Sequence, residues 1–174
     1  MANRDRNVFL AKVADQAERY DEMVNLMKEI VGLGVALTYE ERDLLSVAYK
    51  NAIGSRRAAW RVISALLQKE ELDERKTLLT DYRARVEKEI ADLCQDALSV
   101  LDKVLATAET DEFRIYFHKM KGDYNRYIAE VASADELKSS ATKNGLAAYQ
   151  AATELVKSNS EHLTPVNPIV LGLA

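Results

Sequence analysis

Apolar side chains recur at helical spacing along almost the whole chain. In the first segment, Leu10, Val13, Ala14 and Ala17 lie at positions i, i+3, i+4 and i+7, which gathers them on one face of a helix. Similar spacings return in each later segment. The sequence therefore predicts an all-α fold, an antiparallel array of about six long helices followed by a short C-terminal stub.

Local signals predict where several of these helices begin and end. Gly32 and Gly34 end the second helix, as Gly commonly does just past a C-terminus. A capping box at residues 38–41 opens a long third helix, and a second box at residues 133–136 opens the sixth. The charged stretch over residues 69–76 is expected to form a loop.

Two further long helices are expected over residues 77–107 and 111–132. Large apolar residues spaced by four and three form the seam of the second of these, as in a coiled coil: Phe113, Phe117, Met120, Tyr124, Tyr127 and Val131. In the sixth helix, four residues are expected to face inward: Leu146, Tyr149, Ala152 and Val156. Asn167 and Pro168 give a helix-start signal, as N-cap and first helical residue.

Composition narrows the range of functions. The 174 residues include only 6 Gly and 2 Pro, which leaves little room for a turn-rich β architecture. A net charge of −4 argues against general nucleic-acid binding, which depends on Lys and Arg contacts to phosphates. Cys94 has no partner for an internal disulfide, so a reducing compartment is expected. No apolar run approaches the ~20 residues that span a bilayer, so no membrane contact is expected.

Catalytic chemistry has almost no support in the sequence. His118 and His162 lie in different segments, without Cys, Asp or Glu at ligand spacing around them. No metalloprotease, nucleophile-elbow or phosphate-loop motif is present. Cys94 lies within one position of the apolar seam of its helix, where Cys packs as a small hydrophobe. We therefore expect no enzyme activity, no cofactor and no metal site.

Basic residues in the third and fifth helices form the strongest candidate site. Lys50 and Arg57 are seven residues apart, which stacks them on one helix face, and Arg126 precedes Tyr127. If the two helices run side by side, three cations and a phenol converge, a cluster that suits a phosphate dianion. In a chain that is 30% charged, the same cations could instead be a solvated face, and Tyr127 could simply be core.

A second candidate surface combines small apolar residues with opposite charges. Val13 and Ala17 form a narrow stripe flanked by Arg19 and Glu22. The third and fourth helices offer a comparable set: Ala59, Ile63, Tyr82, Arg85 and Glu89. Such surfaces suit a symmetric dimer contact, although a corner within one chain is an equal alternative.

Short sequence words, in order along the whole chain, carry a resemblance to a known family. They are RYDEM (19–23), LLSVAYKN (44–51), RRAAWR (56–61), KMKGDY (119–124), RY (126–127) and PI with LGLA (168–169 and 171–174). In these words the chain resembles 14-3-3 proteins. The resemblance implies nine antiparallel helices in a cup-shaped dimer that binds phosphoserine or phosphothreonine segments in an amphipathic groove. It also implies no catalysis and no cofactor.

The resemblance implies roles for particular residues. The phosphate pocket carries over to the same cluster that spacing suggests: Lys50, Arg57, Arg126 and Tyr127. The dimer contact carries over to Val13, Ala17, Arg19, Glu22, Ala59, Ile63, Tyr82, Arg85 and Glu89. In that contact, Arg19 would pair with Glu89 of the partner subunit, and Glu22 with Arg85 of the partner subunit. The implied partners are phosphorylated client proteins and a second copy or a related chain; the implied location is cytoplasmic, with the nucleus as a second one.

The chain departs from the family pattern mainly at its C-terminal end. It stops where the family's seventh helix has barely begun, so residues 1–174 are expected to be one incomplete domain. Residues 1–107 would supply the dimerisation and groove-floor helices, and residues 108–174 the groove-side helices. We therefore expect a dimeric, phosphate-dependent adaptor whose ligand binding is weakened by the incomplete groove. The alternative is a helical dimerisation scaffold with a vestigial groove and no phosphate selectivity.

Overall fold

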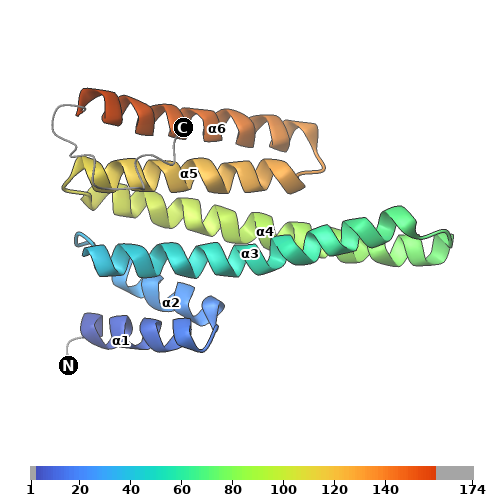
Figure 1. Cartoon of the computed structure of the whole chain (residues 1–174), viewed down its shortest axis with the longest axis horizontal. Coiled ribbons are helices and arrows are strands. Elements are labelled where there is room, and N and C mark those ends of the chain that lie inside the picture. Colours follow the sequence, from blue (N-terminus) through green and yellow to red (C-terminus); the bar gives the residue numbers. More distant parts are fainter. Residues whose placement is uncertain (1–2, 160–174) are drawn as a thin grey trace.

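The computed structural model describes residues 3–159, and this part of the chain folds into six α-helices joined by short turns (Figure 1). They are α1 (Asn3–Gln16), α2 (Tyr20–Val31), α3 (Tyr39–Lys69), α4 (Asp73–Thr107), α5 (Asp111–Val131) and α6 (Asp135–Ser158). The predicted all-α fold with six long helices is confirmed. The predicted helix start at Asn167 and the stub that follows it lie outside the described residues.

Each helix runs antiparallel to the one before it, and the helices lie side by side in sequence order from α1 to α6 (Figure 1). Helices that are neighbours in sequence pack against each other, so α4 packs against both α3 and α5. As a result α3 and α5 run in the same direction. The C-terminal part of α3 and the N-terminal part of α4 extend beyond the other helices as a two-helix projection (Figure 1).

One of the two predicted capping boxes is present. The Glu41 N–H donates to the Thr38 hydroxyl at 3.2 Å, and the Thr38 N–H donates to the Glu41 carboxylate at 2.7 Å. The second box is a wrong prediction, because Ala134 is the N-cap of α6 and no side chain caps that helix. The Ser133 hydroxyl donates instead to Glu87 of α4, at 3.1 Å, so a contact with another helix replaces the local cap.

The loop predicted over residues 69–76 is also mostly wrong, because α4 already begins at Asp73. The Glu70 carboxylate accepts hydrogen bonds from the N–H groups of the next two residues, at 3.0 and 3.1 Å, which tightens the turn. Asp73 and Glu74 then form the first turn of α4. Negative charge is favourable there, beside the partial positive charge of a helix N-terminus.

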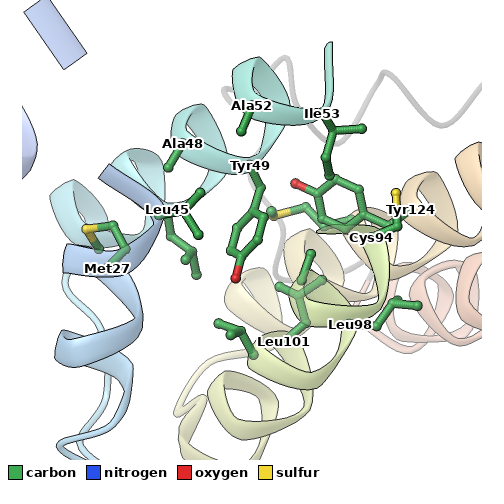
Figure 2. Close-up of a cluster of buried hydrophobic side chains, with 14 of the residues drawn as sticks. Met27, Leu45, Ala48, Tyr49, Ala52, Ile53, Cys94, Leu98, Leu101 and Tyr124 are labelled. Atoms are coloured by element: carbon green, nitrogen blue, oxygen red, sulfur yellow. The ribbon is translucent and has the colours of Figure 1, made fainter. Parts of the chain in front are cut away.

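The residues of the hydrophobic core come mainly from α2, α3, α4 and α5, which pack against one another in sequence order. Figure 2 shows the rings of Tyr49 and Tyr124 beside the α4 residues Cys94 and Leu101, and the two ring centroids are 6.1 Å apart. The Tyr49 hydroxyl donates to the Asp96 carboxylate at 2.6 Å, so its polar atom is satisfied within the core. The predicted burial of Cys94 is confirmed, and burial raises the pKa of its thiol to about 12.

Small residues bring α6 close to α5, so of the four residues predicted to face inward, Ala152 is buried while Tyr149 and Val156 are half-buried. The buried residues of α6 are Ala141, Gly145, Ala148 and Ala152. Leu146 is 58% exposed, so its predicted inward position is wrong. A Cβ on Gly122 of α5 would lie only 2.4 Å from Cε1 of Tyr149, so the Tyr149 ring rests directly on the α5 backbone. This close approach positions one α6 side chain beside the candidate site.

Candidate functional site

Long side chains span the space between α3 and α5, the two helices predicted to carry the phosphate site. At one end of the pair, the Tyr39 and Phe113 rings meet with centroids 4.9 Å apart. At the other end, Arg57 forms an ion pair with Glu130. The two helices are joined through α4, which packs against both. The site is therefore built by side chains that reach across from two parallel helices.

A hollow of about 330 Å³ opens between α3 and α5. Lys50 of α3 lines it, together with Lys119, Asp123, Arg126 and Tyr127 of α5. Three of the four predicted phosphate ligands therefore surround one hollow. The fourth, the arginine of α3, lies beside the hollow rather than on its wall, over the ring of Tyr127.

Arg57 is held on two sides. Its Cζ lies 3.8 Å from the centroid of the Tyr127 ring. Its Nε and Nη2 donate to one oxygen of Glu130, at 2.8 and 2.5 Å, and its side chain is 15% exposed. Within the described residues, Nη1 donates to no hydrogen-bond partner. Glu130 thus occupies one edge of the guanidinium, and the other edge has no partner among the described residues.

Tyr127 supports both arginines of the cluster. The Cζ of Arg126 lies 4.6 Å from the centroid of the same ring that carries Arg57. Guanidinium groups are attracted to the negative face of an aromatic ring. Part of the Tyr127 side chain also packs against the core. Tyr127 is therefore partly core, and its ring also brings two cations together, whereas its predicted role as a phosphate ligand stays a prediction.

Asp123 connects the remaining cations to α6. One carboxylate oxygen accepts from Lys119 Nζ at 2.9 Å. The other accepts from the Tyr149 hydroxyl at 2.7 Å and, more weakly, from Arg126 Nη2 at 3.5 Å. Burial raises the pKa of Tyr149 to about 12; the bond to Asp123 acts in the same direction, and a smaller effect of the contact with Arg126 opposes both. The phenol is therefore a hydrogen-bond donor at neutral pH.

The charges of the cluster do not cancel. Two lysines and two arginines, at 50, 57, 119 and 126, meet two carboxylates, at 123 and 130, which leaves an excess of two positive charges. The Arg126 side chain is 54% exposed and Lys50 is exposed, so both cations can reach a ligand from solvent. The arrangement can hold a dianion that accepts several hydrogen bonds.

Sequence reasoning did not assign Lys119, Asp123, Glu130 or Tyr149 to this site. A signal existed for the first three, because positions 119, 123, 126 and 130 are spaced by three and four and so share one face of α5. No comparable signal marks Tyr149. Its role depends on how closely α6 approaches Gly122, which helical periodicity does not specify.

The predicted dimer residues lie in two places, mostly on the surface. A hollow of about 350 Å³ between α1 and α2 is lined by Val13, Ala17, Arg19 and Glu22, and Val13 is 46% exposed. On α4, Tyr82 is 49% exposed, and Arg85 and Glu89 are exposed as well. The α3 members are less accessible, with Ile63 buried and Ala59 half-buried.

Three of these charged residues already have partners within the chain. Arg19 Nε donates to Glu22 at 2.9 Å, and Glu89 accepts from Arg56 Nε at 3.1 Å. All three of Arg19, Glu22 and Glu89 are nevertheless more than half exposed. Pairing with a second subunit would therefore exchange solvent-exposed ion pairs, which are individually weak.

Other chemistry has little structural basis between residues 3 and 159. No group of three or more His, Cys, Asp or Glu residues there could hold a metal ion. None of the helices in this range is both long enough and apolar enough to cross a membrane. Burial, with a smaller contribution from Lys121, lowers the pKa of His118. Its imidazole therefore favours the neutral form.

Fold and site together define an all-helical protein with a cationic hollow suited to an anionic ligand. Comparison with known proteins gives the family. The family model for 14-3-3 proteins matches residues 10–174, and the chain belongs to the 14-3-3 family.

Individual relatives agree with this assignment. The chain is 49% identical to 14-3-3 protein epsilon of Drosophila melanogaster, over 100% of this chain and 66% of the relative. It is 50% identical to 14-3-3 family protein artA of Aspergillus flavus, over 96% and 70% of the two chains. It is 49% identical to 14-3-3-like protein GF14 epsilon of Arabidopsis thaliana, over 98% and 67%. The chain thus spans about two thirds of the length of these relatives.

Proposed function

We propose that this chain binds protein segments that carry phosphoserine or phosphothreonine, and that it does so as an adaptor without catalysing a reaction. The proposal rests mainly on one observation: Arg57 and Arg126 share the ring of Tyr127, beside Lys50. Family membership supports it. Phosphorylated client proteins are the proposed partners.

The chemistry of the site suits phosphate better than a carboxylate. A phosphate ester carries about −1.5 to −2 charges at pH 7 and has three acceptor oxygens. The open edge of Arg57 can bind two of these oxygens in parallel, and Lys50 adds a point charge. The Tyr127 hydroxyl can donate one further bond. A glutamate side chain brings a single charge and two oxygens, so it satisfies fewer of these donors.

Binding of a matched pair of peptides tests this proposal. Fluorescence anisotropy is measured for a phosphoserine peptide and for the same peptide with unmodified serine. We expect clear binding of the phosphopeptide alone. Arg57→Ala should weaken it about 10- to 100-fold, since a hydrogen bond to a charged group contributes about 1.5–3 kcal/mol. Equal binding of the two peptides by the wild type would contradict the proposal.

A control variant separates the site from overall charge. Arg75→Ala removes the same charge from the start of α4, where the Arg75 side chain is 67% exposed and lies 4.0 Å from Glu70. It should leave the affinity for the phosphopeptide unchanged. An equal loss in Arg57→Ala and Arg75→Ala would mean that net charge, and not the cluster, attracts the peptide.

We also propose that the chain forms a dimer, as a homodimer or with a related chain, and so acts as a scaffold. The α1–α2 hollow and the exposed face of α4 would meet across the two subunits, with Arg19 and Glu89 as one charge pair. Sedimentation velocity of the wild type against Glu89→Lys tests this. We expect the variant to shift toward monomer, while Glu154→Lys, an equal charge change on an exposed residue of α6, stays dimeric.

The two measurements separate the alternative function from the first. A dimerisation scaffold with a vestigial groove would sediment as a dimer and bind both peptides equally weakly. A phosphate-dependent adaptor would distinguish the peptides. The cytoplasm, with the nucleus as a second location, remains the proposed site of action.

A further inference from the structure

We propose that Tyr149 of α6 is a positioning residue of the phosphate site, which keeps Arg126 available to the ligand by holding Asp123. This inference rests on the proposed function. Tyr149 itself does not line the hollow between α3 and α5. It acts from the neighbouring helix, so α6 contributes to a site whose ligands come from α3 and α5.

The position of the Tyr149 ring is fixed by a glycine. Added to Gly122, a Cβ would meet three atoms of this ring, at 2.4 to 2.6 Å, so only glycine lets the ring lie against α5 there. Gly145 makes the reciprocal approach from α6, since a Cβ there would lie 3.4 Å from the Gly122 carbonyl oxygen. The ring therefore has little freedom to move, so its hydroxyl is held in one position.

In this position the hydroxyl contacts the Asp123 oxygen that faces Arg126. Tyr149 donates to this oxygen at 2.7 Å, whereas Arg126 approaches the same oxygen only to 3.5 Å. Elsewhere in the cluster, carboxylates hold their cations much more closely: Glu130 to Arg57 at 2.5 Å and Asp123 to Lys119 at 2.9 Å. Of these three ion pairs, only Asp123–Arg126 is loose, and its shared carboxylate oxygen is the one that also accepts the short hydrogen bond from Tyr149.

Competition for one oxygen explains this difference. A carboxylate beside an unoccupied guanidinium closes onto it as a tight ion pair. A carboxylate closed onto Arg126 in this way would occupy donors of its guanidinium and offset the positive charge that attracts a phosphate. By taking the shared oxygen of Asp123, the Tyr149 hydroxyl keeps that ion pair loose. Arg126 retains a 54% exposed side chain that can turn to the ligand.

Removal of the hydroxyl alone tests the idea. Tyr149→Phe keeps the ring on Gly122 and removes the hydroxyl's contacts with both Asp123 and Arg126, so that these two side chains can close onto each other. We expect the Kd of the phosphoserine peptide to rise about 3- to 10-fold, with helix content unchanged by circular dichroism. Tyr39→Phe is the matched control, because it removes a hydroxyl that donates to Glu112 at 3.1 Å, away from the hollow. It should leave the Kd unchanged.

A double-variant cycle separates positioning from a structural effect. In an Asp123→Asn background there is no carboxylate to pair with Arg126, so Tyr149→Phe should then cause no further loss. An equal loss in both backgrounds would overturn the proposal, and so would unchanged or tighter binding by Tyr149→Phe alone. A wild type that does not distinguish phosphorylated from unmodified peptide refutes the proposed function, and this inference with it. A wild type that distinguishes them while Tyr149→Phe binds equally well refutes only the inference.

Discussion

Replacement of Gly122 by alanine tests how closely α6 must pack on α5. The added Cβ would lie 2.4 Å from Cε1 of Tyr149, and ordinary van der Waals contact begins near 3.4 Å. The ring must therefore shift by roughly 1 Å to restore ordinary contact with the added methyl group. The shift carries the hydroxyl away from Asp123, to which it donates at 2.7 Å.

Two costs oppose one gain in this substitution. Overpacking of a close contact typically costs about 1–3 kcal/mol, and loss of a hydrogen bond to a charged group costs about 1.5–3 kcal/mol. Alanine in place of glycine within a helix returns about 1 kcal/mol. We therefore expect Gly122→Ala to lower the free energy of unfolding by roughly 1.5–5 kcal/mol, and Tm by roughly 3–20 °C.

Gly54 provides the matched control. It lies within α3, and a Cβ added to it meets nothing within 4 Å. Gly54→Ala should therefore show only the gain in helix propensity and stabilise the protein by up to about 1 kcal/mol. Both variants are unfolded in urea at one protein concentration and followed by circular dichroism. A Gly122→Ala protein as stable as Gly54→Ala would refute the close packing of Tyr149 on α5.

Three further outcomes follow from buried groups. Burial raises the pKa of Glu41, but hydrogen bonds from Arg4 and Thr38 lower it more, so the folded-state pKa lies below 4.5. The stability that this carboxylate contributes is present above that value and is lost as the pH falls through the folded-state pKa. Urea unfolding between about pH 5 and pH 3 should therefore show a steeper loss for the wild type than for Glu41→Gln. Cys94, with its thiol pKa raised to about 12 by burial, should react with a thiol reagent only after unfolding in urea; rapid reaction of the folded protein would contradict its buried position. Tyr49→Phe removes a hydroxyl that donates to an α4 carboxylate at 2.6 Å, and should cost about 1.5–3 kcal/mol in the same urea assay; an unchanged midpoint would contradict that bond.

Helix existence could be predicted from the sequence because it depends on local spacing. The seam of α5 is an example: Phe113, Phe117, Met120 and Tyr124 are all buried, as their spacing by four and three indicates. Helix ends were predicted less well, since caps compete with tertiary contacts. Ser133 had the right sequence context for a capping box, but its hydroxyl bonds to Glu87 on another helix.

Some residues of the candidate site could likewise be predicted from the sequence, and others could not. Lys50 and Arg126 could be assigned from residue type and spacing, and they line one hollow. The carboxylates that hold the cations are less predictable, because Glu130 matters only through its reach to Arg57 across the space between two helices. Tyr149 was predicted to face inward, which is correct in part, but its contact with Asp123 depends on the α5–α6 distance. Periodicity gives a residue's face and leaves that distance undetermined.

A crystal structure of the chain with a bound phosphoserine peptide would locate the phosphate relative to the cationic cluster. We expect phosphate oxygens within hydrogen-bonding distance of Arg57, Arg126 and Lys50, with the Tyr127 hydroxyl as a further donor. Arg57 should still hold Glu130 on its Nε edge while its other edge binds the phosphate. A phosphate bound elsewhere, with the hollow between α3 and α5 empty, would show that this cluster is not the phosphate site.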